Sequence, residues 1–375
     1  MKVPVVSTIN GPAQGSYILR GLAAAARSSY FKFTVGCVLI YVVMEVCFDA
    51  KGFNEVDVSK VLGRFSIAEN ITEAQAQGNN GIVTRNQTND IPGVPADVLS
   101  DNIRINSSAG KLCPLIPPNL VGYIPTKMDV PSLEAVESEF PDVMPGGHFR
   151  PKECTSRHRV AILVPYRNRA EHLKIFIYNI HRVLARQQID YGVFVIEQGD
   201  DKEFNRAKLF NVGYLESTAL YDYQCFVFHD IDLVPVDDRN VYTCPQQPRH
   251  MSVRIDSRSG VPYVLMFGGV SALSKELMLR VNGYSNLYWG WGGEDDDMTF
   301  RLKHIKQTIL RRPADIARYT SLKHTQSKKN AGRHAILKKW KERYTKDGLN
   351  SVKYKIMNLE FKKLYTWILV DLRDP

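Results

Sequence analysis

The sequence predicts an α/β domain built on a parallel, doubly wound sheet. Three short apolar runs alternate with two segments of helical length, which is the order expected for such a sheet. A pair of acidic residues follows the third run directly, at the strand end where these sheets bind ligands. The predicted strands are residues 160–165, 191–196 and 225–228, and the predicted helices are residues 171–188 and 205–220.

Each predicted element has its own signal. The run VAILVP at 160–165 is continuously apolar and ends in proline, as a strand buried on both faces does. Within 171–188 the apolar side chains recur at helical spacing, at Leu173, Phe176, Ile177, Ile180 and Leu184. A further strand is predicted at 263–267, followed by a glycine turn at Phe267-Gly-Gly.

An apolar run at residues 33–48, broken chiefly by Glu45, predicts a membrane anchor. The run is short for a span of about 17 to 25 residues, but Lys32 and Glu45 can snorkel toward the headgroups. The preceding 32 residues contain four basic residues and no acid, which favours a cytosolic N-terminus. A cleavable signal peptide is the alternative, although its basic region would be unusually long. We therefore expect a cytoplasmic tail (1–32), a signal anchor (33–48) and a lumenal remainder.

Residues 49–112 resemble a glycosylated stem. They contain three N-glycosylation sequons, at Asn70, Asn86 and Asn106, and neither Cys nor Trp. Their polar and glycine-rich composition is typical of a flexible linker. A folded lumenal domain is expected from residue 113 to residue 375.

The lumenal part contains four cysteines, Cys113, Cys154, Cys225 and Cys244. An even number in an oxidising compartment indicates disulfides. Four cysteines allow three connectivities, of which pairing of sequence neighbours is the simplest. Cys37 and Cys47 lie in the predicted anchor and are not expected to pair.

The formal charge of +10 predicts an acidic partner, such as a nucleic acid, an anionic membrane or a phosphate-bearing substrate. Fifteen Lys or Arg residues occur between Arg301 and Lys346, and a solvated face of helix and loop would explain them equally well. No zinc-finger spacing or RNA-binding motif accompanies them, so nucleic acid is not an expected partner.

The stretch WGWGGEDDD at residues 289–297 places two indoles beside four consecutive carboxylates. Adjacent carboxylates repel one another unless a cation or a proton donor uses them. The indoles offer flat apolar faces of the kind that bind sugar rings. A solvated acidic loop is the alternative, and the Trp-Gly pattern argues against it.

Asp230-Ile-Asp232 follows the third predicted strand and suggests a divalent cation. Carboxylates are hard ligands for Mg²⁺ or Mn²⁺, and such a cation would neutralise a nucleotide diphosphate. His324 is a second candidate ligand, although an isolated histidine is more often structural. An imidazole ligand would favour Mn²⁺ over Mg²⁺.

Two further segments lie where a nucleotide would bind, and the glycine turn at 267–269 would allow close approach of a sugar. Residues 165–169 place two arginines after the first strand, and Asn205 and Arg206 open the second helix. These side chains could hold phosphate, ribose or base. Surface arginines and an ordinary tight turn at 267–269 are the alternatives.

Five motifs resemble the animal β-1,4-galactosyltransferase family, including its invertebrate β-1,4-N-acetylgalactosaminyltransferases. They are FNRAKLFNVG (204–213), DIDLVP (230–235), FGGVSAL (267–273), WGWGGEDDD (289–297) and DGLNSVKY (347–354). The resemblance spans residues 113 to 374. It implies a type II Golgi membrane protein with a lumenal GT-A domain, Mn²⁺ as cofactor and an inverting mechanism.

The resemblance also implies roles for individual residues. Asp232 and His324 are expected to bind the metal, and Asp295 to act as catalytic base. The acceptor sugar is expected against Gly292, Gly293, Glu294 and Asp295. The donor nucleotide is expected against Pro165, Tyr166, Arg167, Asn168, Arg169, Phe204, Asn205, Arg206, Asp230, Ile231 and Trp291. The family's two disulfides match the pairs Cys113–Cys154 and Cys225–Cys244.

Two positions depart from the family pattern. Ser321 stands where many members have a methionine that ligates the metal. Met266 stands where vertebrate galactosyl enzymes have a tyrosine that disfavours an N-acetyl group on the donor. The resemblance and Met266 together predict transfer of GalNAc from UDP-GalNAc to O4 of a terminal β-GlcNAc on a glycolipid or glycoprotein. UDP-Gal is the alternative donor, and a non-catalytic lumenal sugar-binding protein is the alternative of another class.

Overall fold

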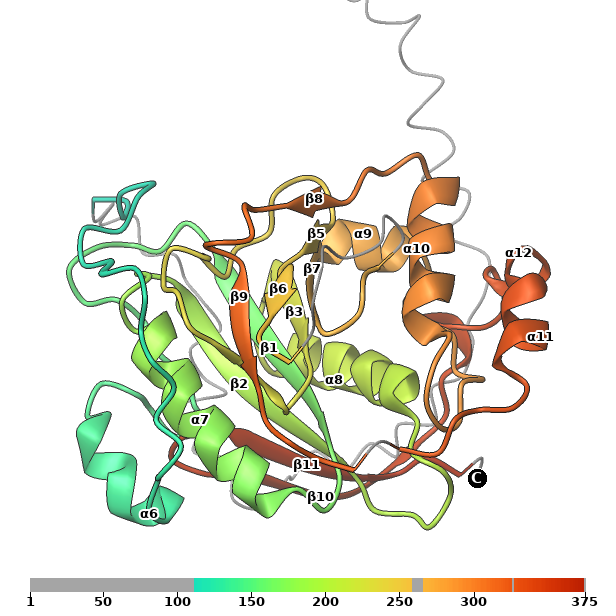
Figure 1. The fold of residues 1–375 in the computed structure, drawn as a ribbon, viewed down its shortest axis with the longest axis horizontal. Coiled ribbons are helices and arrows are strands. Elements are labelled where there is room, and N and C mark those ends of the chain that lie inside the picture. The colour runs from blue at the N-terminus through green and yellow to red at the C-terminus, as the bar shows by residue number, and fades with distance from the viewer. Residues whose placement is uncertain (1–110, 258–265, 326, 374–375) are drawn as a thin grey trace, which may run out of the picture. The chain divides into compact units, whose positions relative to one another are not determined.

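The computed structural model describes residues 111–257, 266–325 and 327–373, which form a mixed eight-stranded sheet flanked by helices (Figure 1). In spatial order its strands are β10 (Lys355–Phe361), β11 (Thr366–Asp371), β2 (Asp190–Gln198), β1 (Arg159–Tyr166), β3 (Cys225–His229), β7 (Val270–Ser274), β5 (Arg249–His250) and β8 (Leu310–Arg311).

The three predicted parallel strands are confirmed, but the sheet as a whole is mixed. β1 pairs in parallel with β2 and β3, and β2 pairs in parallel with β11. β7 is antiparallel to β3, and β10 is antiparallel to β11. The carboxyl ends of β1, β2 and β3 therefore meet at one edge of the sheet, as a doubly wound domain requires.

Helices α7 (Ala170–Leu184) and α8 (Arg206–Leu220) pack on opposite faces of this sheet. Alternate residues of β1 point to opposite faces, so Ile162 joins the α7 core and Leu163 joins the α8 core. The side chain of Asn205 caps α8 by accepting from the amide of Lys208. α7 ends at Leu184, earlier than predicted, and Gln188 has a left-handed φ of 48°.

A second sheet of three short strands lies beside the first. It contains β4 (Leu233–Pro235), β9 (Arg318–Ser321) and β6 (Arg254–Ile255), with β9 between the other two. β4 and β9 are antiparallel, and Leu233 is opposite Ser321. This pairing brings the segment after Asp232 next to the segment that precedes His324.

The acidic run of residues 294–297 opens a helix, which the sequence had not indicated. α10 (Glu294–His304) begins with these four acids, where the helix dipole favours negative charge. Short helices and 3-10 turns complete the described fold: α6 (Leu133–Val136), η1 (Glu137–Glu139), α9 (Lys275–Arg280), α11 (Arg333–Lys338), α12 (Trp340–Arg343) and η2 (Leu349–Ser351).

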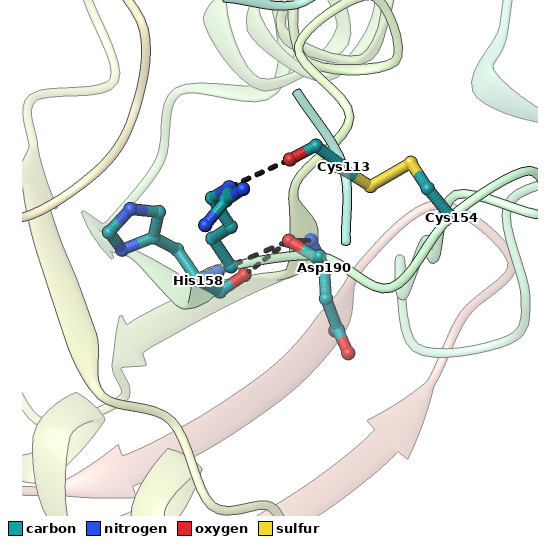
Figure 2. Close-up of a disulfide and its surroundings, with 6 residues drawn as sticks. Cys113, Cys154, His158 and Asp190 are labelled. Carbon is teal, nitrogen blue, oxygen red and sulfur yellow. Dashed lines mark hydrogen bonds between the residues drawn. A yellow bond between two sulfur atoms is a disulfide. The ribbon is translucent and has the colours of Figure 1, made fainter. Parts of the chain in front are cut away.

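Both disulfides join sequence neighbours, as the simplest connectivity predicted. Cys113 is bonded to Cys154, and Cys225 to Cys244. Figure 2 shows the first pair close to His158 and Asp190, where β1 and β2 begin. The Arg157 side chain donates to the carbonyl of Cys113 at 2.7 Å, so this disulfide fastens the start of the domain to the amino edge of the sheet.

The strand predicted at 263–267 is not found where the structure describes it. Residues 263–265 lie outside the described residues, and Met266 and Phe267 belong to no strand. The strand instead begins after the glycines, at Val270, because Gly269 turns the chain with a φ of 80°. The glycine turn is confirmed at Gly269, and the strand predicted before it is absent at Met266 and Phe267.

Several sequence predictions fall outside the described residues. They are the tail at 1–32, the anchor at 33–48, nearly all of the stem at 49–112, and the three sequons at Asn70, Asn86 and Asn106. Among the helices that the structure describes, none has the length and apolar character needed to cross a bilayer.

Candidate active site

The motifs that the sequence singled out converge at the carboxyl edge of the sheet. Arg206, the first residue of α8, forms an ion pair with Asp230, which directly follows β3. The same guanidinium lies 3.2 Å from Glu294 Oε1, at the start of α10. Arg206 therefore joins the predicted nucleotide side of the site to the predicted acceptor side. Its pKa is raised by the two carboxylates, although burial alone would lower it.

The two predicted metal ligands are adjacent. His324 Nδ1 lies 3.2 Å from Asp232 Oδ2, although the residues are far apart in the sequence. The backbone amide of Leu322 donates to the carbonyl of Asp232 at 2.7 Å, which continues the pairing of β4 with β9. The antiparallel ladder thus brings together a carboxylate and an imidazole whose side chains remain partly exposed, at 22% and 30%.

The chemistry of this pair fits Mn²⁺. A carboxylate oxygen and an imidazole nitrogen are ligands that Mn²⁺ accepts, and an imidazole is less suited to Mg²⁺. The described residues contain no group of three or more His, Cys, Asp or Glu side chains that could hold a metal. Ser321, which stands where the family has a methionine ligand, lies in β9 opposite Leu233, and its amide donates to Asp256 at 2.8 Å. The remaining ligands of a cation bound here would come from the substrate or from water.

Asp295 lies in the first turn of α10, against the glycine turn that precedes β7. A Cβ atom added to Gly268 would fall 2.3 Å from Asp295 Oδ2, so a larger residue would collide with this carboxylate. Asp295 Oδ1 accepts from the amide of Asp296 at 3.0 Å, which fixes the side chain at the helix start. Met266 is half-buried two residues before Gly268, and its carbonyl accepts from Arg311 at 2.7 Å. The predicted base and the predicted donor-selecting residue are therefore neighbours in space.

Glu294 is 9% exposed and keeps one carboxylate oxygen without a hydrogen-bond partner. Oε1 pairs with Arg206, whereas the buried Oε2 has no hydrogen bond within the described part of the chain. Burial, and next repulsion by Asp295, raise the pKa of Glu294 to about 7, although Arg206 acts in the opposite direction. The site therefore contains a buried carboxylate oxygen that has no hydrogen-bond partner among the described residues, on the residue next to Asp295.

We expect Glu294 to make the stability of the protein depend on pH. Its pKa is higher in the folded protein than the ordinary value of 4.5, so the folded state holds the proton more tightly. The resulting stabilisation is fully present below about pH 4.5 and is lost as the pH rises through about 7. In urea denaturation, the stability of wild type relative to Glu294→Gln should therefore fall between about pH 5 and about pH 8. The exposed control Glu276→Gln should show no such trend, and a constant difference for Glu294→Gln would contradict the assignment.

Trp291 stands beside the acidic strip and is held by a distant segment. Its amide donates to the carbonyl of Lys328 at 2.9 Å, and its carbonyl accepts from the amide of Asn330 at 3.0 Å. The indole is 46% exposed, with the Arg333 guanidinium 5.9 Å from a ring centroid. Gly293 has a φ of 100°, and a Cβ atom there would lie 2.6 Å from the Tyr288 ring. Gly292 and Gly293 thus let the chain pass closely between Trp291 and α10.

Asp297, the last acid of the strip, has a structural partner that the sequence did not reveal. Its fully buried carboxylate pairs with Arg301 at 2.6 Å and with Arg343 at 3.0 Å. Arg343 also pairs with Asp347, and the Tyr288 hydroxyl donates to Asp297 at 3.0 Å. This network fastens α12 to α10, and the buried guanidinium of Arg301 and the partly buried one of Arg343 offset the cost of clustering four acids.

We expect Arg343→Met to lower the free energy of unfolding by about 3 kcal/mol, because Asp297 would lose one of its two buried cations. Arg280→Met is a matched control, since Arg280 forms an exposed pair with Glu276 on α9 and its loss should cost about 0.5 kcal/mol or less. Denaturation of both variants by urea measures the difference. Equal effects would show that the Arg343 network adds no more than a surface ion pair.

The other predicted nucleotide residues lie at the same edge, and two of the arginines already bind the protein. Arg167 donates to the carbonyl of Lys202 at 2.7 Å and lies over the Phe204 ring. Arg169 donates to the carbonyl of Thr325 at 3.5 Å, next to His324. Pro165 and Tyr166 end β1, Asn168 has a left-handed φ of 52°, and Asn205 and Ile231 are buried. The segment 165–169 therefore contacts the segment 323–325 through Arg169, and it also lines the carboxyl edge of the sheet.

Comparison with known proteins agrees with this geometry. Residues 113–245 match the model of the N-terminal region of glycosyl transferase group 7, and residues 249–325 match that of the N-terminal domain of galactosyltransferase. The chain is 45% identical to beta-1,4-galactosyltransferase 1 of Mus musculus, covering 76% of this chain and 73% of the relative. It is 47% identical to beta-1,4-galactosyltransferase 1 of Homo sapiens, covering 70% and 67%.

Solved structures show the same fold. The catalytic domain of Drosophila beta-1,4-galactosyltransferase 7 in complex with xylobiose matches with a TM-score of 0.51 and 28% identity, over 58% of this chain and 95% of that one. A mutant of that enzyme, in complex with manganese, UDP-Gal and xylobiose, matches with a TM-score of 0.51 and 29% identity, over the same fractions. The GT-A type predicted from the motifs is therefore the fold of the described domain.

Proposed function

The chain belongs to the β-1,4-galactosyltransferase family of group 7 glycosyl transferases, and we propose that it transfers GalNAc from UDP-GalNAc to O4 of a terminal β-GlcNAc. It is a hexosyltransferase that uses Mn²⁺. The observation that carries the proposed reaction is the position of Asp295, across Gly268 from Met266 and joined to the nucleotide edge through Glu294 and Arg206.

The proposed reaction follows from what each group can do. Asp295 takes the proton from O4 of the acceptor, and that oxygen forms a bond to C1 of the donor sugar. The bond from C1 to the diphosphate breaks from the opposite face, so an α-linked donor gives a β-linked product. When bound by Asp232 and His324, Mn²⁺ supplies positive charge to the departing diphosphate. Glu294 Oε2, which has no hydrogen-bond partner in the described residues, would accept from a sugar hydroxyl once the acceptor is bound and so orient it.

UDP-Gal remains the second candidate donor, because the similar proteins at 45% and 47% identity are named galactosyltransferases. Met266 favours UDP-GalNAc, since a flexible thioether leaves room for an acetamide and carries no competing hydroxyl. The presence of both Asp295 and the Asp232–His324 pair argues against a non-catalytic sugar-binding protein.

Release of UDP tests the proposal directly. Each donor is incubated with the protein, with and without GlcNAc and with and without Mn²⁺. We expect UDP release that needs both Mn²⁺ and GlcNAc and is faster with UDP-GalNAc. Faster release with UDP-Gal would replace the proposed donor, and release that does not depend on GlcNAc would refute the acceptor.

The donor preference should depend on Met266. We expect Met266→Tyr to shift the ratio of kcat/KM for UDP-GalNAc over UDP-Gal by about tenfold toward UDP-Gal, equivalent to about 1.4 kcal/mol. The larger side chain and its hydroxyl would occupy the space beside C2 of the donor sugar. Met266→Leu is the matched control, because it changes shape with little change in volume and adds no hydroxyl. An unchanged ratio in Met266→Tyr would show that this position does not select the donor.

We also propose that the protein is a single-pass type II Golgi membrane protein with the boundaries predicted from the sequence, and that its acceptors are glycolipids or glycoproteins. The apolar run at 33–48 and the sequons Asn70, Asn86 and Asn106 support this topology. Digestion of the cell-made protein with an N-glycosidase should lower its mass, and the triple Asn→Gln variant should lack this change. A wild-type protein whose mass is insensitive to the glycosidase would contradict a lumenal stem.

A further inference from the structure

The turn at residues 266–269 is held by two side chains from neighbouring strands. The carbonyl of Met266 accepts a hydrogen bond from the Arg311 guanidinium at 2.7 Å, and the carbonyl of Gly268 accepts from His250 Nε2 at 3.0 Å. His250 is completely buried, and Arg311 is partly buried. Two carbonyl groups of this turn are therefore fixed by side chains that the proposed reaction does not use.

The strand register places these two side chains next to each other. His250 is opposite Arg311 where β5 pairs in parallel with β8, and it is opposite Ser271 where β5 pairs with β7. β5 therefore lies between β7 and β8 (Figure 1). Because the turn leads directly into β7, side chains of β5 and β8 reach its carbonyl groups.

His250 and Arg311 also contact each other, and this contact fixes the tautomer of the imidazole. Arg311 Nε donates to His250 Nδ1 at 3.2 Å. A guanidinium has only donors, so Nδ1 is the acceptor and the proton of the neutral imidazole is on Nε2. That proton is the one donated to the carbonyl of Gly268. Arg311 therefore acts on the turn twice, directly at Met266 and through His250 at Gly268.

The position of this turn decides how much room the donor sugar has under the proposed function. Met266 lies at one end of the turn, and a Cβ atom on Gly268 would fall 2.3 Å from Asp295 Oδ2. A shift of the turn would move the side chain beside C2 of the donor and alter the contact with the proposed base. Functional groups are held to within about 0.5 Å by supporting hydrogen bonds of this kind.

We propose that Arg311 is a positioning residue for donor selection, because it holds the carbonyl of Met266 and the imidazole of His250 and so sets the space beside C2 of the donor sugar. The inference rests on the proposed function, since it places Met266 beside the donor. Arg311 acts through the turn and takes no part in the proton transfer. Its effect is on the selectivity between UDP-GalNAc and UDP-Gal, whichever of the two the wild type prefers.

The test is the donor selectivity of Arg311→Met, expressed as the ratio of kcat/KM for the preferred donor over the other donor. Met keeps an apolar stem and removes every hydrogen-bond donor. We expect the ratio to fall about three- to tenfold toward one, because a turn released from Arg311 accommodates both sugars. Binding of UDP alone with Mn²⁺ should change by less than about twofold, since UDP lacks the sugar. An unchanged ratio would overturn the proposal.

A double-mutant cycle with Met266→Tyr shows whether Arg311 acts through position 266. In the wild-type background Met266→Tyr is expected to shift the donor ratio about tenfold. In the Arg311→Met background the shift should be about threefold or less, because the tyrosine is no longer held against the donor. Shifts of equal size in the two backgrounds would show that Arg311 is independent of Met266, and would also overturn the proposal.

Two further variants separate positioning from a general loss of stability. Arg311→Lys keeps the charge but loses the forked geometry, so its ratio should fall by about two- to threefold. If Arg311→Met does not fold, Arg311→Lys gives the same test, and an unchanged ratio there counts against the proposal. Arg343→Met is expected to destabilise the domain and should keep the wild-type ratio. An equal fall for Arg343→Met would show that any loosening of the domain has this effect, and would overturn the assignment to Arg311.

The outcomes distinguish this inference from the proposed function. A wild type that prefers UDP-Gal, with a lower ratio in Arg311→Met, would replace the proposed donor and support the positioning role. A preference for UDP-GalNAc that Arg311→Met leaves unchanged would support the proposed donor and overturn the positioning role. If no sugar is transferred, the proposed reaction fails, and the dissociation constants of the two UDP-sugars with Mn²⁺ supply the ratio. A wild type that binds and uses the two donors equally would overturn both.

Discussion

Asp295→Asn is expected to lower the rate of sugar transfer by about 10² to 10⁴, the usual cost of removing a general base. The amide keeps the size of the side chain and its place against Gly268, but it cannot take a proton from the acceptor hydroxyl. Because Asp295 is separate from the Asp232–His324 pair, binding of UDP in the presence of Mn²⁺ should change by less than about twofold.

Single-turnover transfer and UDP binding are measured for wild type, Asp295→Asn and a control, Asp201→Asn. Asp201 is an exposed carboxylate in the loop after β2, at the same edge of the sheet. The control should keep the wild-type rate. Near-normal transfer by Asp295→Asn would show that Asp295 is not the general base. A parallel loss of UDP binding would show that the substitution disturbs the nucleotide side as well.

Local signals predicted the part of the fold that depends on near neighbours in the chain. Continuous apolar runs identified β1, β2 and β3, helical spacing identified α7, and the length of the segment between the second and third strands identified α8. The acidic pair after β3 was placed correctly because the carboxyl edge of a parallel sheet follows from strand order alone. The even number of lumenal cysteines left three connectivities open, and the disulfides confirm the simplest of them, which the family resemblance also implied.

Contacts between distant segments were not predictable from pattern. β11 is parallel to β2 from more than 160 residues away, and no local feature specifies that neighbour. Asp297 is buried against Arg343, whose sequence context is an exposed basic helix. The adjacency of Asp232 and His324 depends on the β4–β9 ladder, so the residues alone left His324 uncertain and the family resemblance assigned it.

The many Lys and Arg residues near the C-terminal end of the chain show what amino-acid composition alone does not predict. The excess of Lys and Arg between Arg301 and Lys346 suggested an acidic partner, and it also allowed a simple solvated face. The structure separates these residues by environment. Arg301 is fully buried in the network with Asp297, whereas Lys338 and Lys339 are exposed. Charge count alone could not distinguish a structural guanidinium from one available to a ligand.

Substitution of either residue of the Asp232–His324 pair should have the second large effect, on the binding of Mn²⁺ and of the UDP-sugar. Asp232→Ala and His324→Ala are each expected to weaken Mn²⁺ by at least about tenfold and to weaken the UDP-sugar in parallel, because the cation joins the protein to the diphosphate. The two side chains face each other at 3.2 Å, so each variant leaves one ligand without its partner. The hydroxyl of Ser321, in β9 opposite Leu233, is neutral and cannot replace a lost carboxylate.

Mn²⁺ titrations of UDP-sugar binding and of transfer measure this coupling, and His334→Ala is the matched control. His334 lies on α11, where it is exposed and forms no part of the Asp232–His324 pair. The control should keep the wild-type Mn²⁺ dependence. The two metal-site variants should require more Mn²⁺ for half-maximal activity, and their transfer at saturating Mn²⁺ should recover more fully for His324→Ala, which retains the carboxylate. Wild-type Mn²⁺ dependence in either variant would exclude that residue as a ligand, and weaker Mn²⁺ binding without weaker UDP-sugar binding would show that the cation does not bridge protein and donor.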